Sequence, residues 1–162
     1  MKQFYESVGK AIKSYQTADH LVHTTYLVVK DPKLMLLAAK HLRDFFDNGM
    51  SALIYYDYYY KRIPHLPKDF KDKIDLFRRF ICDKYNMPRS IIQLILDLNN
   101  IYSEHKSSEI EFRRKNNFVI ATKNYKLRTL NSEKLKNFLV LSKPLLIKIT
   151  EVKKINDRIP LP

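Results

Sequence analysis

The stretch KLMLLAAKHLRDFFDNGMSALIYYDYYY (33–60) carries apolar side chains at every third or fourth position, which is the pattern of an amphipathic α-helix. Pro32 suits the first turn of this helix, and Asp31 is placed to cap it. A similar pattern over residues 3–29 predicts a helix before it. We therefore expect two long helices that pack as an antiparallel hairpin.

Three further helices are expected along the rest of the chain. Apolar periodicity predicts one over 70–86, one from Pro88 through Tyr102, and a last one that begins at Asn131 or Ser132. The resulting fold class is mainly α, a single bundle of about five helices with a β-hairpin inserted before the last helix. We expect one domain over residues 1–155 and a frayed tail over 156–162.

The inserted hairpin is predicted from alternation of apolar and polar residues over about 117–130. NFVIAT (117–122) and YKLRTL (125–130) read as two strands joined by a two-residue turn at Lys123 and Asn124. This register pairs Thr122 with Tyr125, Ile120 with Leu127 and Phe118 with Thr129. It places Lys126 and Arg128 together on the opposite face.

The small numbers of glycine and cysteine residues argue against several classes of enzyme. The chain has only two glycines, Gly9 and Gly49, which argues against folds and enzyme classes that need glycine-rich phosphate loops or nucleophile elbows. Gly49 lies on the apolar stripe of its helix, so we expect a neighbouring helix to approach closely there. The single cysteine, Cys82, falls in an apolar helical stretch and is expected to be buried and inert.

Neither a secretory signal nor a transmembrane segment is recognisable in the sequence. The apolar run IIQLILDL (91–98) is too short for a span and is interrupted by Gln93 and Asp97. We expect a cytoplasmic location.

Positive charge is concentrated in the second part of the chain. Residues 1–60 carry 7 Lys and Arg against 6 Asp and Glu, whereas residues 61–162 carry 23 against 11. Such segregation indicates a polyanionic partner, and RNA is the preferred one. The alternatives are a merely solvated basic surface and an acidic protein or lipid surface. The expected phosphate contacts are Lys106, Arg113, Arg114, Lys115, Lys126 and Arg128, with Lys123 beside them, and Lys61, Arg62, Arg78, Arg79 and Arg89 as further contributors.

The segment YYDYYY (55–60) places tyrosines all around a helix, so that some must be exposed. Tyr56 and Tyr59 continue the apolar stripe and are expected to be buried. Tyr55 and Tyr58 are candidates for an interface with a second copy or another protein, or for stacking on bases.

Two groups of polar residues could support other chemistry. Asp19, His20 and His23 share one helical turn and could face His41 and Asp44 on the next helix, but their spacing matches no familiar metal motif, and we expect neither metal nor cofactor. Glu104, His105, Glu109 and Glu111 precede Arg113 and Arg114, which is the layout of a metal-independent ribonuclease. We prefer a non-catalytic protein, with this enzyme as an alternative.

The stretches TADHLVHTTYLVVKDPKL (17–34), SALIYYDYYYKRIP (51–64) and HKSSEIEFRRKNNFVIATKNYKLRTL (105–130) resemble an uncharacterised group of small, mainly helical archaeal proteins. This resemblance covers about half the chain and implies a cellular setting without a named activity. As a fold analogy, the predicted bundle is also similar to HEPN domains, which include RNA-cutting toxins and the nucleotide-binding partners of toxin–antitoxin pairs. The HEPN signature of an Arg followed five to seven positions later by a His does not occur here, which argues against a ribonuclease of that type.

Overall fold

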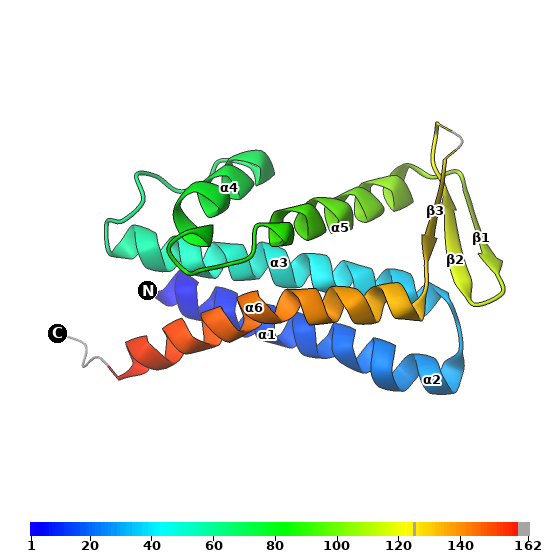
Figure 1. Cartoon of the computed structure of the whole chain (residues 1–162), viewed down its shortest axis with the longest axis horizontal. Coiled ribbons are helices and arrows are strands. Elements are labelled where there is room, and N and C mark those ends of the chain that lie inside the picture. The colour runs from blue at the N-terminus through cyan, green and yellow to red at the C-terminus, as the bar shows by residue number, and fades with distance from the viewer. Residues whose placement is uncertain (125, 159–162) are drawn as a thin grey trace.

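Two long helical segments run antiparallel along the molecule. The computed structural model describes residues 1–124 and 126–158. Helix α1 (Lys2–His20) continues through a π-helical turn (Leu21–Thr25) into α2 (Tyr26–Val29), and α3 (Lys33–Tyr59) returns beside them (Figure 1). Lys30, with φ of 53°, ends the first segment, and the Asp31 carboxylate accepts a hydrogen bond from the Lys33 amide at 3.0 Å. The predicted helical hairpin and its cap are confirmed.

Three further helices complete the bundle. They are α4 (Phe70–Leu76), which continues as a π-helical stretch to Cys82, α5 (Ser90–Ser107) and α6 (Ser132–Asp157). The Asn131 side chain caps α6 by accepting from the Lys134 amide at 2.9 Å. None of the helices over residues 1–124 and 126–158 combines the length and apolar character needed to cross a membrane.

The C-terminal helix is longer than the sequence predicts. Instead of fraying from residue 156, α6 continues to Asp157, because Asn156 is buried and its amide donates to the Tyr5 hydroxyl at 2.6 Å. The Tyr60 hydroxyl in turn donates to the Asn156 side-chain oxygen at 3.2 Å. The remaining part of the predicted tail, 159–162, lies outside the described residues.

One apolar core joins the helices to the sheet. Its largest fully buried side chains include Phe4, Phe45, Phe46 and Phe77, and the same cluster contains Phe118, Ile120 and Leu130 from the strands. The sheet is therefore packed onto the end of the bundle and is not a detached arm. It lies at the opposite end of the molecule from α4 (Figure 1).

The sheet has three strands where the sequence predicts two. Strands β1 (Ile110–Arg114), β2 (Asn117–Ala121) and β3 (Leu127–Leu130) pair antiparallel in chain order. Every residue of β1 is exposed. The first connection is a tight turn in which Lys115 takes a φ of 54°.

The register between β2 and β3 differs by one residue from the predicted one. Ile120 pairs with Arg128 and Ala121 with Leu127, so the predicted pairs Ile120–Leu127 and Phe118–Thr129 are wrong. The connection between the paired residues is longer than a two-residue turn, and the Thr122 amide donates to the Lys126 carbonyl at 2.9 Å. The predicted Thr122–Tyr125 pair lies outside the described residues.

This register defines two faces of the sheet, because residues directly paired across antiparallel strands point the same way. We call the face that packs on the helices the inner face, which contains Glu111, Arg113, Phe118, Ile120, Arg128 and Leu130. The outer face contains Ile110, Phe112, Arg114, Asn117, Val119, Ala121, Leu127 and Thr129.

Candidate nucleic-acid interface

The outer face of the sheet is apolar at its centre and yet open to solvent. Ile110 is 62% exposed, Phe112 40% and Leu127 61%, whereas Val119 between them is buried. Three large apolar side chains on one small sheet face form an exposed hydrophobic patch, and contact of such a patch with water is unfavourable. A flat aromatic ligand or another apolar surface is what such a face accommodates.

Three cations occupy the β1–β2 end of the sheet. Arg113 and Arg114 are the last residues of β1, and Lys115 follows them in the turn. All three are exposed, and within the described part of the chain no carboxylate lies within ion-pair distance of them. Their charges are therefore available to an external anion.

A second group of cations surrounds a groove at the other end of β2. This groove, which we call the basic groove, has a volume of about 750 Å³ and lies between the β2–β3 connection, the end of α5 and the first turn of α6. Four cations and one carboxylate line it, among hydroxyl and amide side chains. The lining residues are Glu104, Ser107, Thr122, Lys123, Asn124, Lys126, Leu127, Arg128, Thr129 and Lys134.

The charges inside the basic groove are only partly compensated. Arg128 donates twice to Glu104, through Nε to Oε2 and through Nη2 to Oε1, the latter at 2.9 Å, and this pairing raises the pKa of Arg128 above its ordinary value. Burial, followed by the charge of Arg128, lowers the pKa of the Lys134 ammonium. A bound anion would relieve this repulsion between Arg128 and Lys134.

Arg128 does not occupy the position that the sequence predicts. The one-residue register shift turns its side chain from the outer to the inner face, where it is half-buried and engaged by Glu104. Lys126 remains exposed and lines the basic groove as an unpaired cation within residues 1–124 and 126–158. Of these two predicted contacts, Lys126 is the one that is free to meet a phosphate.

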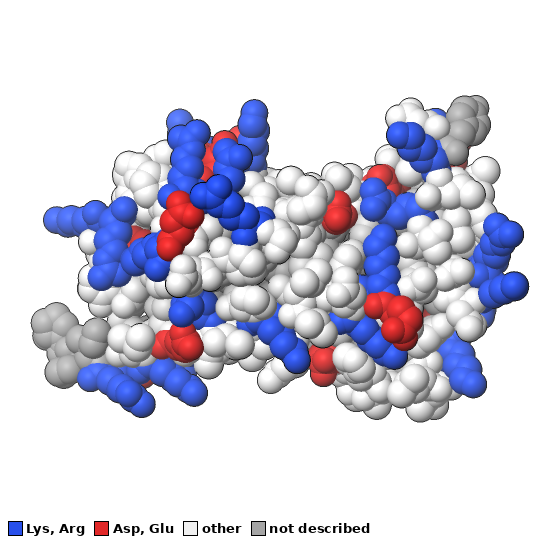
Figure 2. Space-filling view, in the orientation of Figure 1, with Lys and Arg blue, Asp and Glu red and all other residues white. Residues whose placement is uncertain are grey.

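The other predicted cations do not join this surface as one patch. Lys106 lies on the last turn of α5, and its Nζ is 4.9 Å from the centre of the Tyr102 ring, beside a different pocket. Lys61, Arg62, Arg78 and Arg79 belong to the end of α3 and the segment around α4, at the far end of the bundle, and Arg89 directly precedes α5. Figure 2 shows Lys and Arg at both ends of the molecule, with carboxylates between them and a mostly uncharged middle. On the face that this view shows, positive charge is thus gathered at two ends and does not form one continuous patch.

The tyrosine-rich end of α3 is partly exposed. Tyr58 is open to solvent and Tyr55 is half-buried, and both line a cavity of about 580 Å³ together with Tyr59. Tyr56 is buried as predicted, but Tyr59 is 53% exposed, so its predicted burial is wrong. A contact with another protein through Tyr55 and Tyr58 stays a prediction.

The histidine and cysteine candidates do not form a metal site in the described part of the chain. Asp19 Oδ1 lies 3.0 Å from His23 Nδ1 one turn further along the same segment. Among residues 1–124 and 126–158, no three His, Cys, Asp or Glu side chains come together to hold a metal ion. Cys82 is buried as predicted, and burial raises the pKa of its thiol to about 11.

Three residues of the ribonuclease alternative take part in two separate pairs, one of them with Arg128, which is not among the residues of that alternative. His105 Nδ1 lies 2.6 Å from Glu111 Oε1, and Glu104 is engaged by Arg128. Arg113 and Arg114 point to opposite faces of β1. Catalysis by this group stays a prediction.

Sequence reasoning missed the most exposed parts of this interface. The run Ile110, Glu111, Phe112 does alternate as a strand does, but the neighbouring charges conceal that signal. Lys134 was detectable in principle, because it follows β3 by a few residues and must lie near that strand. Comparison of the chain with family models, with curated proteins and with solved structures gave no match, so its function is argued from this site alone.

Proposed function

We propose that this protein binds single-stranded nucleic acid, preferably RNA, at the sheet end of the bundle and without catalysis. The observation that carries the proposal is an exposed apolar face with an aromatic ring, Phe112, between two groups of cations. Unpaired strands offer both phosphates and accessible base faces, which this combination suits.

The dimensions of the sheet fit a short stretch of strand. Five residues of β2 separate Arg114 and Lys115 at one end from the basic groove at the other, a distance of about 16 Å at ~3.3 Å per residue. Bases of a strand laid across β1 and β2 can stack on Phe112 while its phosphates reach Arg114, Lys115 and Lys126. A duplex keeps its bases inside, so it leaves the apolar face uncovered.

The first experiment measures binding of a labelled single-stranded RNA by fluorescence anisotropy, with the matching duplex as a comparison. We expect tight binding of the single strand at low salt and weaker binding of the duplex. For these three phosphate contacts, affinity should fall about 20-fold between roughly 50 and 200 mM salt. No binding at low salt, or an affinity that salt does not change, contradicts the proposal.

A second experiment separates stacking from charge. Phe112→Ala should weaken binding about tenfold, the usual effect of losing one stacking ring, without changing the salt dependence. Phe80→Ala is the matched control, because Phe80 is 37% exposed and Phe112 40%, and Phe80 lies in the segment after α4 at the other end. Equal affinities for Phe112→Ala and the wild type would rule out the stacking role.

A further inference from the structure

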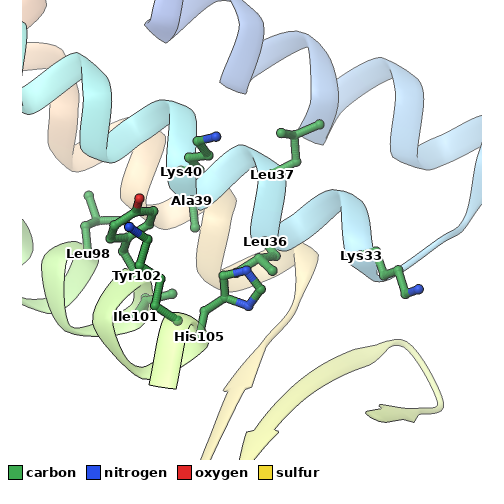
Figure 3. Close-up of a pocket in the computed structure, with 10 residues that line it drawn as sticks. Lys33, Leu36, Leu37, Ala39, Lys40, Leu98, Ile101, Tyr102 and His105 are labelled. Atoms are coloured by element: carbon green, nitrogen blue, oxygen red, sulfur yellow. The ribbon is translucent and has the colours of Figure 1, made fainter. Parts of the chain in front are cut away.

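A second pocket lies between the first half of α3 and the second half of α5. Its volume is about 340 Å³, and Figure 3 shows the two helices that form its walls. Ala39, Leu98 and Ile101 are almost completely buried and form the floor. The small side chain of Ala39 leaves the space open, because a methyl group cannot fill the gap between the two helices.

All ionisable groups around this pocket, apart from Tyr102, are basic. Lys33 and Lys40 come from α3, and His105 and Lys106 from α5. No carboxylate lines it, and the nearest one shown to engage a lining residue is Glu111, which meets His105 Nδ1. The pocket therefore has an apolar floor beneath a cationic rim.

The surroundings of Tyr102 show that the potential at the rim of this pocket is positive. The Arg43 guanidinium lies 4.3 Å and the Lys106 ammonium 4.9 Å from the centre of its ring. Lys106 above all, and then Arg43 and Lys40, lower the pKa of the Tyr102 hydroxyl. Negative charge is thus stabilised at the rim of the pocket, where the head of a ligand would lie.

We propose that this pocket binds a small amphiphilic anion. Its single carboxylate or phosphate head lies at Lys40 and Lys106, and its hydrocarbon tail covers Ala39, Leu98 and Ile101. The size is that of a small-molecule site, at the lower end of the usual range of about 300–1,000 Å³. An inorganic ion would pair with the cations but leave the apolar floor in contact with water. A neutral hydrocarbon would cover the floor but leave the cations without a partner, so neither ligand matches the whole pocket. This site is separate from the sheet surface proposed to bind nucleic acid.

The test is calorimetric titration of the full chain with decanoate and with decyl phosphate, each below its micelle concentration. We expect one molecule bound per chain, and the tighter of the two identifies the head group. Decanol should bind at least tenfold more weakly than decanoate, and decyltrimethylammonium should not bind. In the series hexanoate, octanoate and decanoate, each added methylene should raise affinity about fourfold until the pocket is full.

Substitutions at the rim and at the mouth of the pocket test whether decanoate binds there. Lys40→Glu with Lys106→Glu should weaken decanoate binding at least tenfold and leave the weak binding of decanol unchanged. The matched control is Lys68→Glu with Lys71→Glu, two exposed lysines beside α4. Leu37→Trp, at a position that is 40% exposed and so has room for a larger side chain, should block the mouth and abolish binding of both compounds.

The proposal is overturned by any of three results. They are equal affinity for decanoate and decanol, several bound molecules per chain, and decanoate binding that survives both the Lys40→Glu/Lys106→Glu change and Leu37→Trp.

Discussion

At the scale of single residues, Asp57 is the most constrained group in the described chain. Its side chain is fully buried, and its Oδ1 accepts hydrogen bonds from Arg62 Nη1 at 3.2 Å, from Tyr85 Oη at 3.1 Å and from Lys84 Nζ. Its Oδ2 has no partner among the described residues. Because a buried carboxylate is unfavourable unless it is paired, this cluster holds the segment after α4 against the end of α3.

The Asp57 cluster predicts how stability depends on alkaline pH. Burial first, and then the charge of Asp57, raise the pKa of the Tyr85 hydroxyl. Above about pH 10 the unfolded chain loses this proton while the native state keeps it, so the free energy of unfolding falls by up to about 1.4 kcal/mol per pH unit. Urea unfolding between about pH 9 and 11 measures the fall. Tyr85→Phe should make the fall shallower, although Tyr15 and Tyr56, whose pKa values are also raised by burial, still contribute to it.

Cys82 titrates in the same range, since its pKa is raised to about 11. The protein with Tyr85 and the Tyr85→Phe variant should therefore both carry Cys82→Ala. Identical pH slopes with Tyr and with Phe at position 85 would show that Tyr85 is not protected from ionisation.

At the scale of elements, the contact between α3 and α6 depends on a missing side chain. A Cβ built on Gly49 would lie 2.8 Å from Leu145 Cδ2 and 3.2 Å from Leu145 Cγ. Leu145 is completely buried, so a shift of its side chain would disturb its neighbours in a close-packed core. A neighbouring helix does approach Gly49, as its position on the apolar stripe predicts, but the atoms nearest to it belong to the Leu145 side chain and not to a backbone.

The two glycines provide a matched pair of substitutions. Gly49→Ala should destabilise the protein by about 1–2 kcal/mol, because overpacking against Leu145 exceeds the gain in helix propensity. Gly9→Ala should stabilise it by about 1 kcal/mol, since Gly9 is an exposed helical residue with no atom within 4 Å of an added Cβ. Thermal or urea unfolding measures both. Two stabilised variants would mean that α6 tolerates a methyl group at Gly49.

The helices were predictable from sequence to a greater degree than the sheet, and the reason is burial. The long helices α1, α3, α5 and α6 each present an apolar stripe to the core, so their period is unambiguous. Strand β1 has no buried residue, and its alternation of Ile110, Glu111, Phe112 and Arg113 resembles a charged loop. The predicted register of β3 is wrong because it places the apolar Leu127 opposite Ile120, on the inner face. The Glu104 carboxylate instead favours Arg128 at that position, and no local pattern reveals a partner on α5.

At the scale of the whole molecule, the two basic ends are electrostatically independent. Helix α3 has 27 residues and runs between them, which corresponds to about 40 Å at ~1.5 Å per residue. The Debye length is about 10 Å at 0.1 M salt, so cations beside α4 contribute little to the potential at the sheet. The net charge of +13 therefore overstates the attraction that either end exerts on a short ligand.

This independence predicts which cations set the salt dependence of RNA binding. For a short single strand, each phosphate contact contributes a slope of about −0.7 to the plot of log affinity against log salt. Changing Arg114, Lys115 and Lys126 to Gln should therefore make the slope shallower by about 2. Changing Lys68, Lys71 and Arg79 to Gln should leave it unchanged, although both triple variants lower the net charge equally. Anisotropy titrations at several salt concentrations give the slopes. If the two triple variants reduce the slope alike, attraction arises from net charge as a whole, and the sheet end is not a defined binding surface.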